Sequence, residues 1–242
     1  MIKIEETEVM NFNGATRGMR NPLESWIRRD SKYILNKFVL GENDLKLSKT
    51  LSTAGGDHGK LLRQIFVCTD ITAPLYWWKE YSTYKVGTVE NSTSTMHKIH
   101  TKSFHEELFS MEDLTEEDFK VLQPVFNHLE KLRLEYNDVK DTSIWRRIIQ
   151  MNFDSMNQKR TVTLNYENLR NMYHARKNHK LTEWHEFCDW IKTLPYSEEL
   201  IMSKRKSIDH DEMIIKKDEY NNLLKRLSDL EFYKVNNEMR RI

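Results

Sequence analysis

The chain has 242 residues, with 38 Lys and Arg against 37 Asp and Glu and a formal net charge of +1 at pH 7. This length suits one domain with a sizeable hydrophobic core, or one domain plus an appendage. The balanced charge argues against a protein that coats a nucleic-acid polymer. No apolar run approaches the ~18 residues that a membrane helix needs, and the N-terminus has no signal-peptide pattern. We therefore expect a cytoplasmic protein without a membrane partner.

The two cysteines, Cys68 and Cys188, lie in apolar segments and have no paired spacing. This pattern predicts buried free thiols in a reducing compartment, and it argues against a disulfide framework or a zinc site. We expect no metal site.

The first 71 residues alternate between patterned and turn-rich segments. Apolar and charged residues alternate in the first segment, as in a half-buried strand. The Gly and Arg residues of the second favour a surface loop over a phosphate-binding loop. Apolar residues spaced by three or four predict helices in the next two. The predicted elements are a strand over 2–9, a loop over 11–22, helices over 23–38 and 43–53, and a central, largely apolar strand over 61–71.

The stretch 71–96 concentrates Trp, Tyr, Lys and hydroxyl residues, a composition typical of a site. Pro74 suits the first turn of a helix, which we expect to stop near Gly87. The polar run 91–95 follows, and it can hold a phosphate or a polar ring. On composition alone, the alternative is a buried aromatic core followed by a solvated loop.

The rest of the chain is predominantly helical by pattern. Thr115 and Asp118 form a capping-box pattern, and Pro124 predicts a kink or break. Apolar residues at a spacing of three to four in the charged tail favour helix packing over contact with nucleic acid or membrane. The predicted elements are strands over 94–101 and 159–164, helices over 104–109, 115–138 and 143–151, a helix from 165 that pauses at 177–180 and resumes at 182, and a helical tail over 203–242.

The stretch from Ala73 to Met96 resembles the signature region of the flavin-dependent thymidylate synthases (ThyX). The Ala-Pro start agrees, and Lys or Thr occupies several positions at which the family has Arg or Ser. Thr83 and Tyr84 replace an Arg-His pair, and Glu90-Asn91 inverts the family's order. Thr95 replaces an Arg that holds the nucleotide in the family.

Two further segments extend the resemblance to residues 40–195. His58 falls on the family's flavin-contacting His, whereas Gln64 replaces a second His. The segment from Asn165 is similar to another family motif, and the coinciding residues are Asn165, Leu169, Arg176 and Trp184. The sequence contains no P-loop, no nucleophile elbow and no Rossmann glycine motif.

The resemblance implies an α/β (α+β) catalytic domain over 1–202, with an antiparallel-rich sheet flanked by helices and a helical tail over 203–242. It implies an FAD-dependent methyltransferase that converts dUMP to dTMP with methylenetetrahydrofolate and NADPH, in nucleotide biosynthesis. A homotetramer is implied because family active sites are shared between subunits.

The resemblance also implies site residues. Arg176 has the catalytic role, as a guanidinium facing the uracil. The implied flavin-binding residues are His58, Thr83, Tyr84, Lys85, Asn91, Asn165 and Asn171. The implied nucleotide-binding residues are Lys79, Glu80, Thr93, Ser94, Thr95, Arg147 and Arg176.

The altered motif positions leave two alternatives open. One is a ThyX-like flavoenzyme that modifies C5 of another pyrimidine nucleotide. The other is a non-catalytic ThyX-like protein that serves as a binding or oligomeric protein.

Overall fold

A computed structural model describes residues 1–205, 221–222 and 225 of the chain. The chain divides into two units, Met1–Lys204 and Arg205–Ile242, and the elements described below belong to the first. The helix predicted for the tail over 203–242 lies almost entirely outside the described residues. In the part that is described, no helix is long and apolar enough to cross a membrane.

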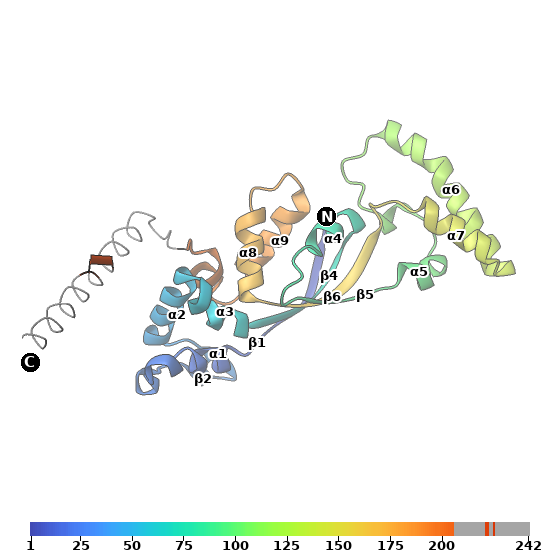
Figure 1. Ribbon diagram of the computed structural model, residues 1–242. Coiled ribbons are helices and arrows are strands. Elements are labelled where there is room, and N and C mark those ends of the chain that lie inside the picture. The colour runs from blue at the N-terminus through green and yellow to red at the C-terminus, as the bar shows by residue number, and fades with distance from the viewer. Residues whose placement is uncertain (206–220, 223–224, 226–242) are drawn as a thin grey trace, which may run out of the picture. The chain divides into compact units, whose positions relative to one another are not determined.

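A four-stranded antiparallel sheet forms the centre of the first unit (Figure 1). Val67, Ile71 and Ala73 of its second strand are fully buried, whereas Phe66 is 39% exposed. Successive side chains of a strand point to opposite faces, so one face carries the core and the other is partly open. In spatial order the strands are β1 (Lys3–Met10), β4 (Phe66–Pro74), β6 (Asn157–Asn165) and β5 (Val89–Ser92).

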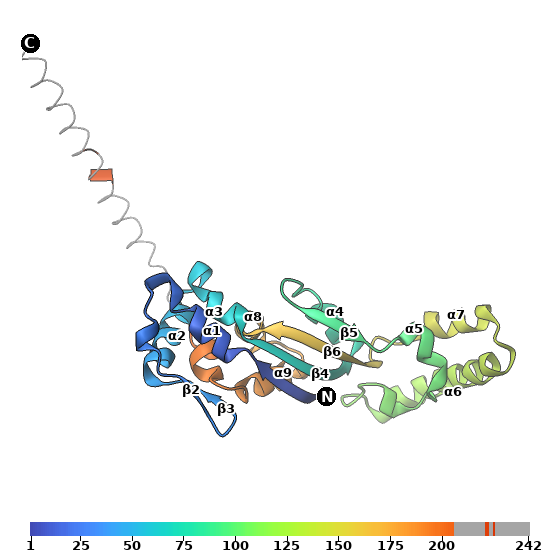
Figure 2. The ribbon, with the colours of Figure 1, turned by 90° about the horizontal axis from the view of Figure 1, so that it is seen from below.

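Helices cover the buried face of the sheet and continue beyond its ends (Figures 1 and 2). The α-helices are α1 (Phe12–Gly18), α2 (Glu42–Ala54), α3 (Lys60–Gln64), α4 (Leu75–Tyr81), α5 (Thr95–Lys98), α6 (Glu116–Val139), α7 (Thr142–Met151), α8 (Tyr166–Arg176) and α9 (Thr182–Lys192). Shorter helical turns are η1 (Asn21–Leu23), η2 (Trp26–Arg28), η3 (Gly56–Gly59), η4 (Ile99–Thr101), η5 (Glu106–Leu108) and the π-turn η6 (Glu198–Met202).

The core has two parts. The larger joins the sheet to α4, α8 and α9, and fully buried aromatic side chains such as Trp77, Tyr166 and Trp184 dominate it. The smaller lies between α6, α7 and η4, around Phe126, Leu129 and Ile148. The architecture confirms the predicted antiparallel-rich sheet flanked by helices.

Several predicted elements are confirmed with shifted ends. The strands at β1 and β6, and the helices at α2, α6, α7, α8 and α9, follow the predicted periods. The Thr115–Asp118 capping box opens α6 as predicted. Pro124 does not break this helix, because it lies on the exposed side, where water can satisfy the carbonyl that a proline leaves without a donor.

The region before α2 corrects two predictions. The predicted loop over 11–22 contains α1, which buries Phe12 against Tyr166 at a ring distance of 5.5 Å. The predicted helix over 23–38 is instead η1, η2 and the hairpin of β2 (Lys32–Ile34) and β3 (Lys37–Val39). Leu35 and Asn36 both have positive φ, as a two-residue hairpin turn requires.

Further corrections concern short segments. The predicted strand over 61–71 begins as α3, and β4 starts only at Phe66. The predicted helix over 104–109 reduces to η5, because Phe104 and Phe109 both turn into the smaller core. The predicted strand over 94–101 is α5 followed by η4, since the Ser94 hydroxyl accepts the His97 amide and caps a helix there.

Candidate active site

Glu80 is the centre of a polar cluster between α4, α8 and α9. Trp77, Trp78 and Tyr81 bury one side of α4, and this places Glu80 at its end beside α8. The Glu80 carboxylate pairs with Arg176 and accepts a hydrogen bond of 2.8 Å from the indole of Trp184. His179 Nε2 lies 3.4 Å from the same carboxylate.

This cluster fixes the orientation of the Arg176 side chain but leaves it partly exposed to solvent. Its Nε donates to the Tyr84 hydroxyl at 2.8 Å, and its guanidinium lies over the rings of Tyr84 and Trp184 at 5.5 and 5.1 Å. The side chain is 20% exposed. Its Nη2 has no hydrogen-bond partner among the described residues. The guanidinium therefore has a set orientation and a free donor edge.

The loop between α4 and β5 lies against the start of α8. Asn168 Nδ2 donates to the Val86 carbonyl at 2.7 Å, and Gly87 has φ +76°. The predicted helix end at Gly87 is therefore wrong. Helix α4 ends at Tyr81, where the Thr83 hydroxyl donates to the Glu80 carbonyl at 2.8 Å and occupies an acceptor of the last turn.

The predicted flavin-binding residues partly gather along this loop and α8. Thr83 and Lys85 are exposed on the loop, and Asn171 is exposed on α8 between the Asn168 anchor and Arg176. Asn165 is buried at 7% exposure, and its side chain caps α8 in a capping box with Asn168. Its amide group still faces Gly87, where an added Cβ would lie 2.9 Å from Nδ2.

A second group of predicted residues surrounds a small hollow of about 50 Å³ after β5. Thr93, Ser94 and Thr95 line it, as the sequence placed them together. Lys98, Lys102 and Asn157 also line it, and these three were not predicted.

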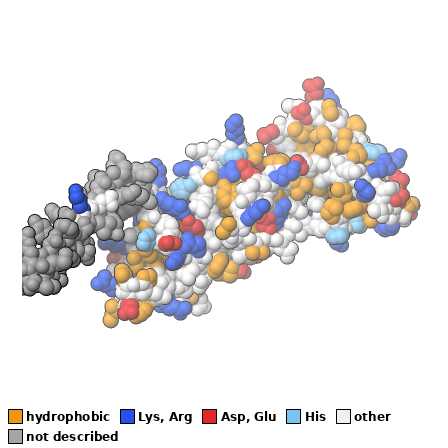
Figure 3. Space-filling view, viewed as in Figure 1, with side chains coloured by type: hydrophobic (Ala, Val, Ile, Leu, Met, Phe, Trp, Pro, Cys, Tyr) orange, Lys and Arg blue, Asp and Glu red, His pale blue; other side chains and the backbone are white. Residues whose placement is uncertain are grey.

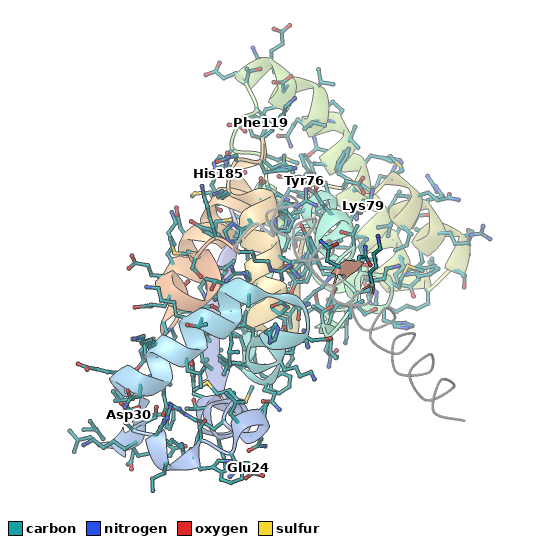
Figure 4. The ribbon with its side chains drawn as sticks, turned by 60° about the vertical axis from the view of Figure 1, so that its left-hand side comes forward. Glu24, Asp30, Tyr76, Lys79, Phe119 and His185 are labelled. Carbon is teal, nitrogen blue, oxygen red and sulfur yellow. The ribbon has the colours of Figure 1, made fainter. Side chains whose placement is uncertain are left out.

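Lys79 and Asn91 lie apart from both groups. Lys79 extends from α4 near Tyr76 (Figure 4) and forms an exposed ion pair with Asp154. Asn91 is exposed on β5, opposite Thr161 of β6.

His58 and Arg147 are at opposite ends of β4. His58 is in η3, shortly before α3, and it lines a hollow of about 660 Å³ together with residues of the segment 19–28 and of α2. Arg147 is exposed on α7, which precedes the start of β6 opposite Pro74. The nine residues of β4 span ~30 Å. One chain does not bring His58 and Arg147 to a single small ligand.

A second ion pair beside the loop escaped sequence reasoning. Arg160 of β6 pairs with Glu90 of β5, and its guanidinium lies 4.3 Å from the centre of the Trp78 ring. Burial, followed by the Glu90 charge, raises the pKa of the Tyr81 hydroxyl next to it. The partners come from distant segments, so no local spacing indicates the pair. The same holds for the contacts of His179 and Trp184 with Glu80.

The face of the molecule seen in Figure 3 has no large field of one sign. Lys and Arg side chains alternate with Asp and Glu over the face in Figure 3, in agreement with the net charge of +1. Both cysteines are free, Cys188 is buried, and burial raises its pKa to about 11, so it is an unreactive thiol. Within the described ranges, no group of three His, Cys, Asp or Glu can hold a metal ion.

Comparison with known proteins gives matches at the level of structure alone. No protein-family model and no curated protein sequence matches the chain. ThyX from Helicobacter pylori, solved with FAD and dUMP, has a TM-score of 0.63 and 16% identity over 83% of this chain and 97% of its own. A second Helicobacter pylori ThyX structure with FAD and dUMP has a TM-score of 0.61 and 17% identity over 84% and 100%. This chain has the ThyX fold.

A third structure with this fold is PolB, a UMP/dUMP methylase from Streptomyces cacaoi bound with 5-Br dUMP. It has a TM-score of 0.55 and 13% identity, over 84% of this chain and 95% of its own. The ThyX fold thus also occurs in a protein described as acting on two pyrimidine nucleotides.

Proposed function

We propose that this chain is a flavin-dependent thymidylate synthase that converts dUMP to dTMP with FAD, methylenetetrahydrofolate and NADPH. The observation that carries the proposal is Arg176, a guanidinium fixed by Glu80 and Tyr84 with one edge free. The ThyX fold and the matching sequence segments support it.

The residues around the α4–β5 loop fit a flavin. Thr83 supplies a hydroxyl, Lys85 an ammonium group and Asn171 an amide, and all three are exposed. Lys85 has no ion pair with any described residue. Such donors suit a pyrophosphate and the polar edge of an isoalloxazine ring. When bound, FAD would supply the hydride chemistry that the side chains lack.

Arg176 has a role toward the nucleotide in this proposal. Its free edge donates to the uracil and stabilises the negative charge that develops as C5 becomes nucleophilic. A preorganised donor of this kind is worth ~2–4 kcal/mol. Glu80 and Tyr84 are positioning residues, because they hold the guanidinium before the nucleotide arrives.

The complete site needs a second copy of the chain. His58 and Arg147 lie at opposite ends of a strand that spans ~30 Å, so both reach one flavin and its nucleotide only if they come from different subunits. We propose a homotetramer, as the resemblance implies.

A second candidate is modification of C5 in another pyrimidine nucleotide. Thr83, Tyr84 and Thr95 depart from the ThyX pattern, and PolB is described as a methylase of both UMP and dUMP. These observations favour testing both nucleotides.

The test is an assay of purified protein with FAD, NADPH and methylenetetrahydrofolate, supplied with dUMP or UMP. Mass spectrometry should detect dTMP from dUMP, and Arg176→Ala should abolish it. Product from UMP alone would favour the second candidate. Absence of product from both, with no FAD bound, would leave the non-catalytic alternative.

A further inference from the structure

The hollow after β5 differs from the rest of the surface in its charge. Lys98 and Lys102 line it, and no Asp or Glu is among its described lining residues. Neither lysine forms an ion pair or a side-chain hydrogen bond within the described part of the chain. By contrast, Lys79, Lys159 and Lys192 each pair with an Asp.

The hydroxyl and amide groups of the hollow add further donors. Thr93 and Thr95 make no side-chain hydrogen bond to a described residue. The Asn157 Oδ1 atom accepts a hydrogen bond of 2.9 Å from the Ser110 hydroxyl. The Nδ2 group of Asn157 has no hydrogen-bond partner among the described residues. The Ser94 oxygen caps α5 at 3.0 Å from the His97 amide and keeps its own proton to donate. Ammonium, hydroxyl and amide donors thus line the hollow, with no carboxylate among its described lining residues.

The volume of the hollow limits what it can hold. At about 50 Å³ it has room for one small polyatomic group, because a water molecule needs at least ~10–15 Å³ of such a cavity and pockets for drug-sized ligands have ~300 Å³ or more. A phosphate group matches both the size and the donors.

The positive charge of Lys98 acts beyond its own side chain. His100, packed against Tyr136 at a ring distance of 5.0 Å, has a pKa lowered by burial and then by Lys140, Lys98 and Arg133. Glu130 accepts a hydrogen bond from the Phe104 backbone amide and is paired with Arg133. Among the described residues, no carboxylate forms a salt bridge with Lys98 or Lys102.

We propose that Lys98 and Lys102 bind the 5′-phosphate of the pyrimidine nucleotide, with Thr93, Ser94, Thr95 and Asn157 as hydrogen-bond donors. The proposal rests on the proposed function for the identity of the nucleotide. Thr95 stands where the ThyX pattern has an Arg, so this position carries no guanidinium. In our proposal, Lys98 and Lys102 supply the positive charge instead.

Calorimetry of the full chain with dUMP, deoxyuridine and inorganic phosphate tests the assignment. The double variant Lys98→Met/Lys102→Met should bind dUMP at least about tenfold more weakly, as expected when charged hydrogen bonds to phosphate are lost. Its deoxyuridine affinity and FAD content should not change. Lys98→Arg/Lys102→Arg should restore dUMP binding, and Lys120→Met, an exposed lysine on α6, should have no effect.

Thr95→Arg gives an independent check. Because two cations already face the hollow, a third should crowd them and leave dUMP affinity unimproved. Tighter binding by this variant would contradict the assignment, as would a double variant with dUMP affinity within twofold of wild type or an equal loss for deoxyuridine.

The experiments distinguish a wrong assignment of phosphate binding to the hollow from a wrong proposed function. If wild type makes dTMP and the lysine variants bind dUMP normally, the phosphate-binding role of the hollow is wrong and the proposed function stands. If wild type is colourless and inactive but binds inorganic phosphate through Lys98 and Lys102, the proposed function is wrong and the phosphate-binding role stands. Wild type that binds neither dUMP nor inorganic phosphate would contradict the phosphate-binding role as well.

Discussion

Arg176 is a partly exposed arginine that is held in place both by hydrogen bonds and by aromatic rings. Two of its nitrogens bond to Glu80 and Tyr84, and its guanidinium stacks near two aromatic rings. Arg17, on the last turn of α1, is exposed and forms no ion pair with a described residue. Holding the Arg176 side chain in one orientation costs conformational entropy. A ligand-binding role for this guanidinium would explain that cost.

We predict that Arg176→Ala leaves FAD bound but removes dUMP binding and turnover. Loss of a charged hydrogen bond to a ligand should cost about 1.5–3 kcal/mol, or a ten- to hundredfold loss of affinity. Calorimetry with dUMP and a flavin absorption spectrum measure the two effects separately. Arg17→Ala is the matched control and should change neither. Unchanged dUMP affinity in Arg176→Ala would refute the role of this residue.

The sequence identified the residues of this site better than it predicted the contacts between them. Arg176, Glu80 and Tyr84 were all predicted as site residues, and the structure places them in direct contact. Lys98 and Lys102 were missed, because the segment 94–101 was predicted as a strand. No local spacing marks the residues that line the hollow, to which Lys98 comes from the end of α5 and Lys102 from the residue after η4.

At the scale of elements, the loop between α4 and β5 depends on Gly87. It has φ +76°, and an added Cβ would lie 2.9 Å from Asn165 Nδ2. Gly56 in η3 also has positive φ, +53°, but nothing lies within 4 Å of its Cβ position. Comparing alanine substitutions at Gly87 and Gly56 therefore separates the cost of backbone strain from the cost of steric crowding.

We predict that both Gly87→Ala and Gly56→Ala destabilise the protein, by roughly 1 kcal/mol of backbone strain each. Gly87→Ala should cost more, since it also displaces the Asn165 side chain, and it alone should weaken FAD binding. Thermal unfolding and flavin titration measure the two variants. Equal losses of stability with equal FAD affinity would show that the loop is not held at Gly87.

A buried ion pair fixes the segment before α2 to that helix. The Asp44 carboxylate, 0% exposed, accepts hydrogen bonds from Arg20 and from Ser31. Asp30, labelled in Figure 4, accepts in turn from the Asp44 amide. Burial alone would raise the pKa of Asp44, but the Ser31 and Arg20 bonds outweigh it and hold the pKa below its usual value of 3.8.

We predict that Asp44→Asn destabilises the chain by roughly 3–5 kcal/mol, as when one partner of a buried pair is removed. Because the folded pKa is lowered, Asp44 stabilises the protein above pH ~4, and this contribution is lost as the pH falls through the folded pKa. The stability difference between wild type and variant should therefore shrink in acid. Asp189→Asn, which breaks an exposed pair with Lys192, should cost less than about 1 kcal/mol at any pH.

The elements that sequence reasoning found are those with a long, regular period. Helices α6 and α8 and strand β6 follow their apolar spacing closely. The β2–β3 hairpin was missed because its apolar residues are mostly exposed, so their spacing carried no information about a buried face. Short capped turns such as α5 depend on one side chain, Ser94, and hydrophobic periodicity does not report that.

At the scale of the whole molecule, His58 and Arg147 lie too far apart in one chain to meet at one ligand. We predict that His58→Ala and Arg147→Ala are each inactive alone but regain part of the activity when mixed and reassembled. Mixed oligomers would contain some sites in which neither residue is altered. Sedimentation should give four times the chain mass of 29.2 kDa. A monomer at micromolar concentration, or mixing without recovery, would contradict a shared site.

We predict that this chain, which has the ThyX fold, binds a flavin. The most direct measurement is the visible absorption spectrum of the purified protein, followed by mass spectrometry of the cofactor released on denaturation. We predict a yellow protein with the absorption bands of an oxidised flavin, releasing FAD at about one molecule per chain. A protein that is colourless as purified, and that stays colourless after addition of FAD and gel filtration, would contradict the claim.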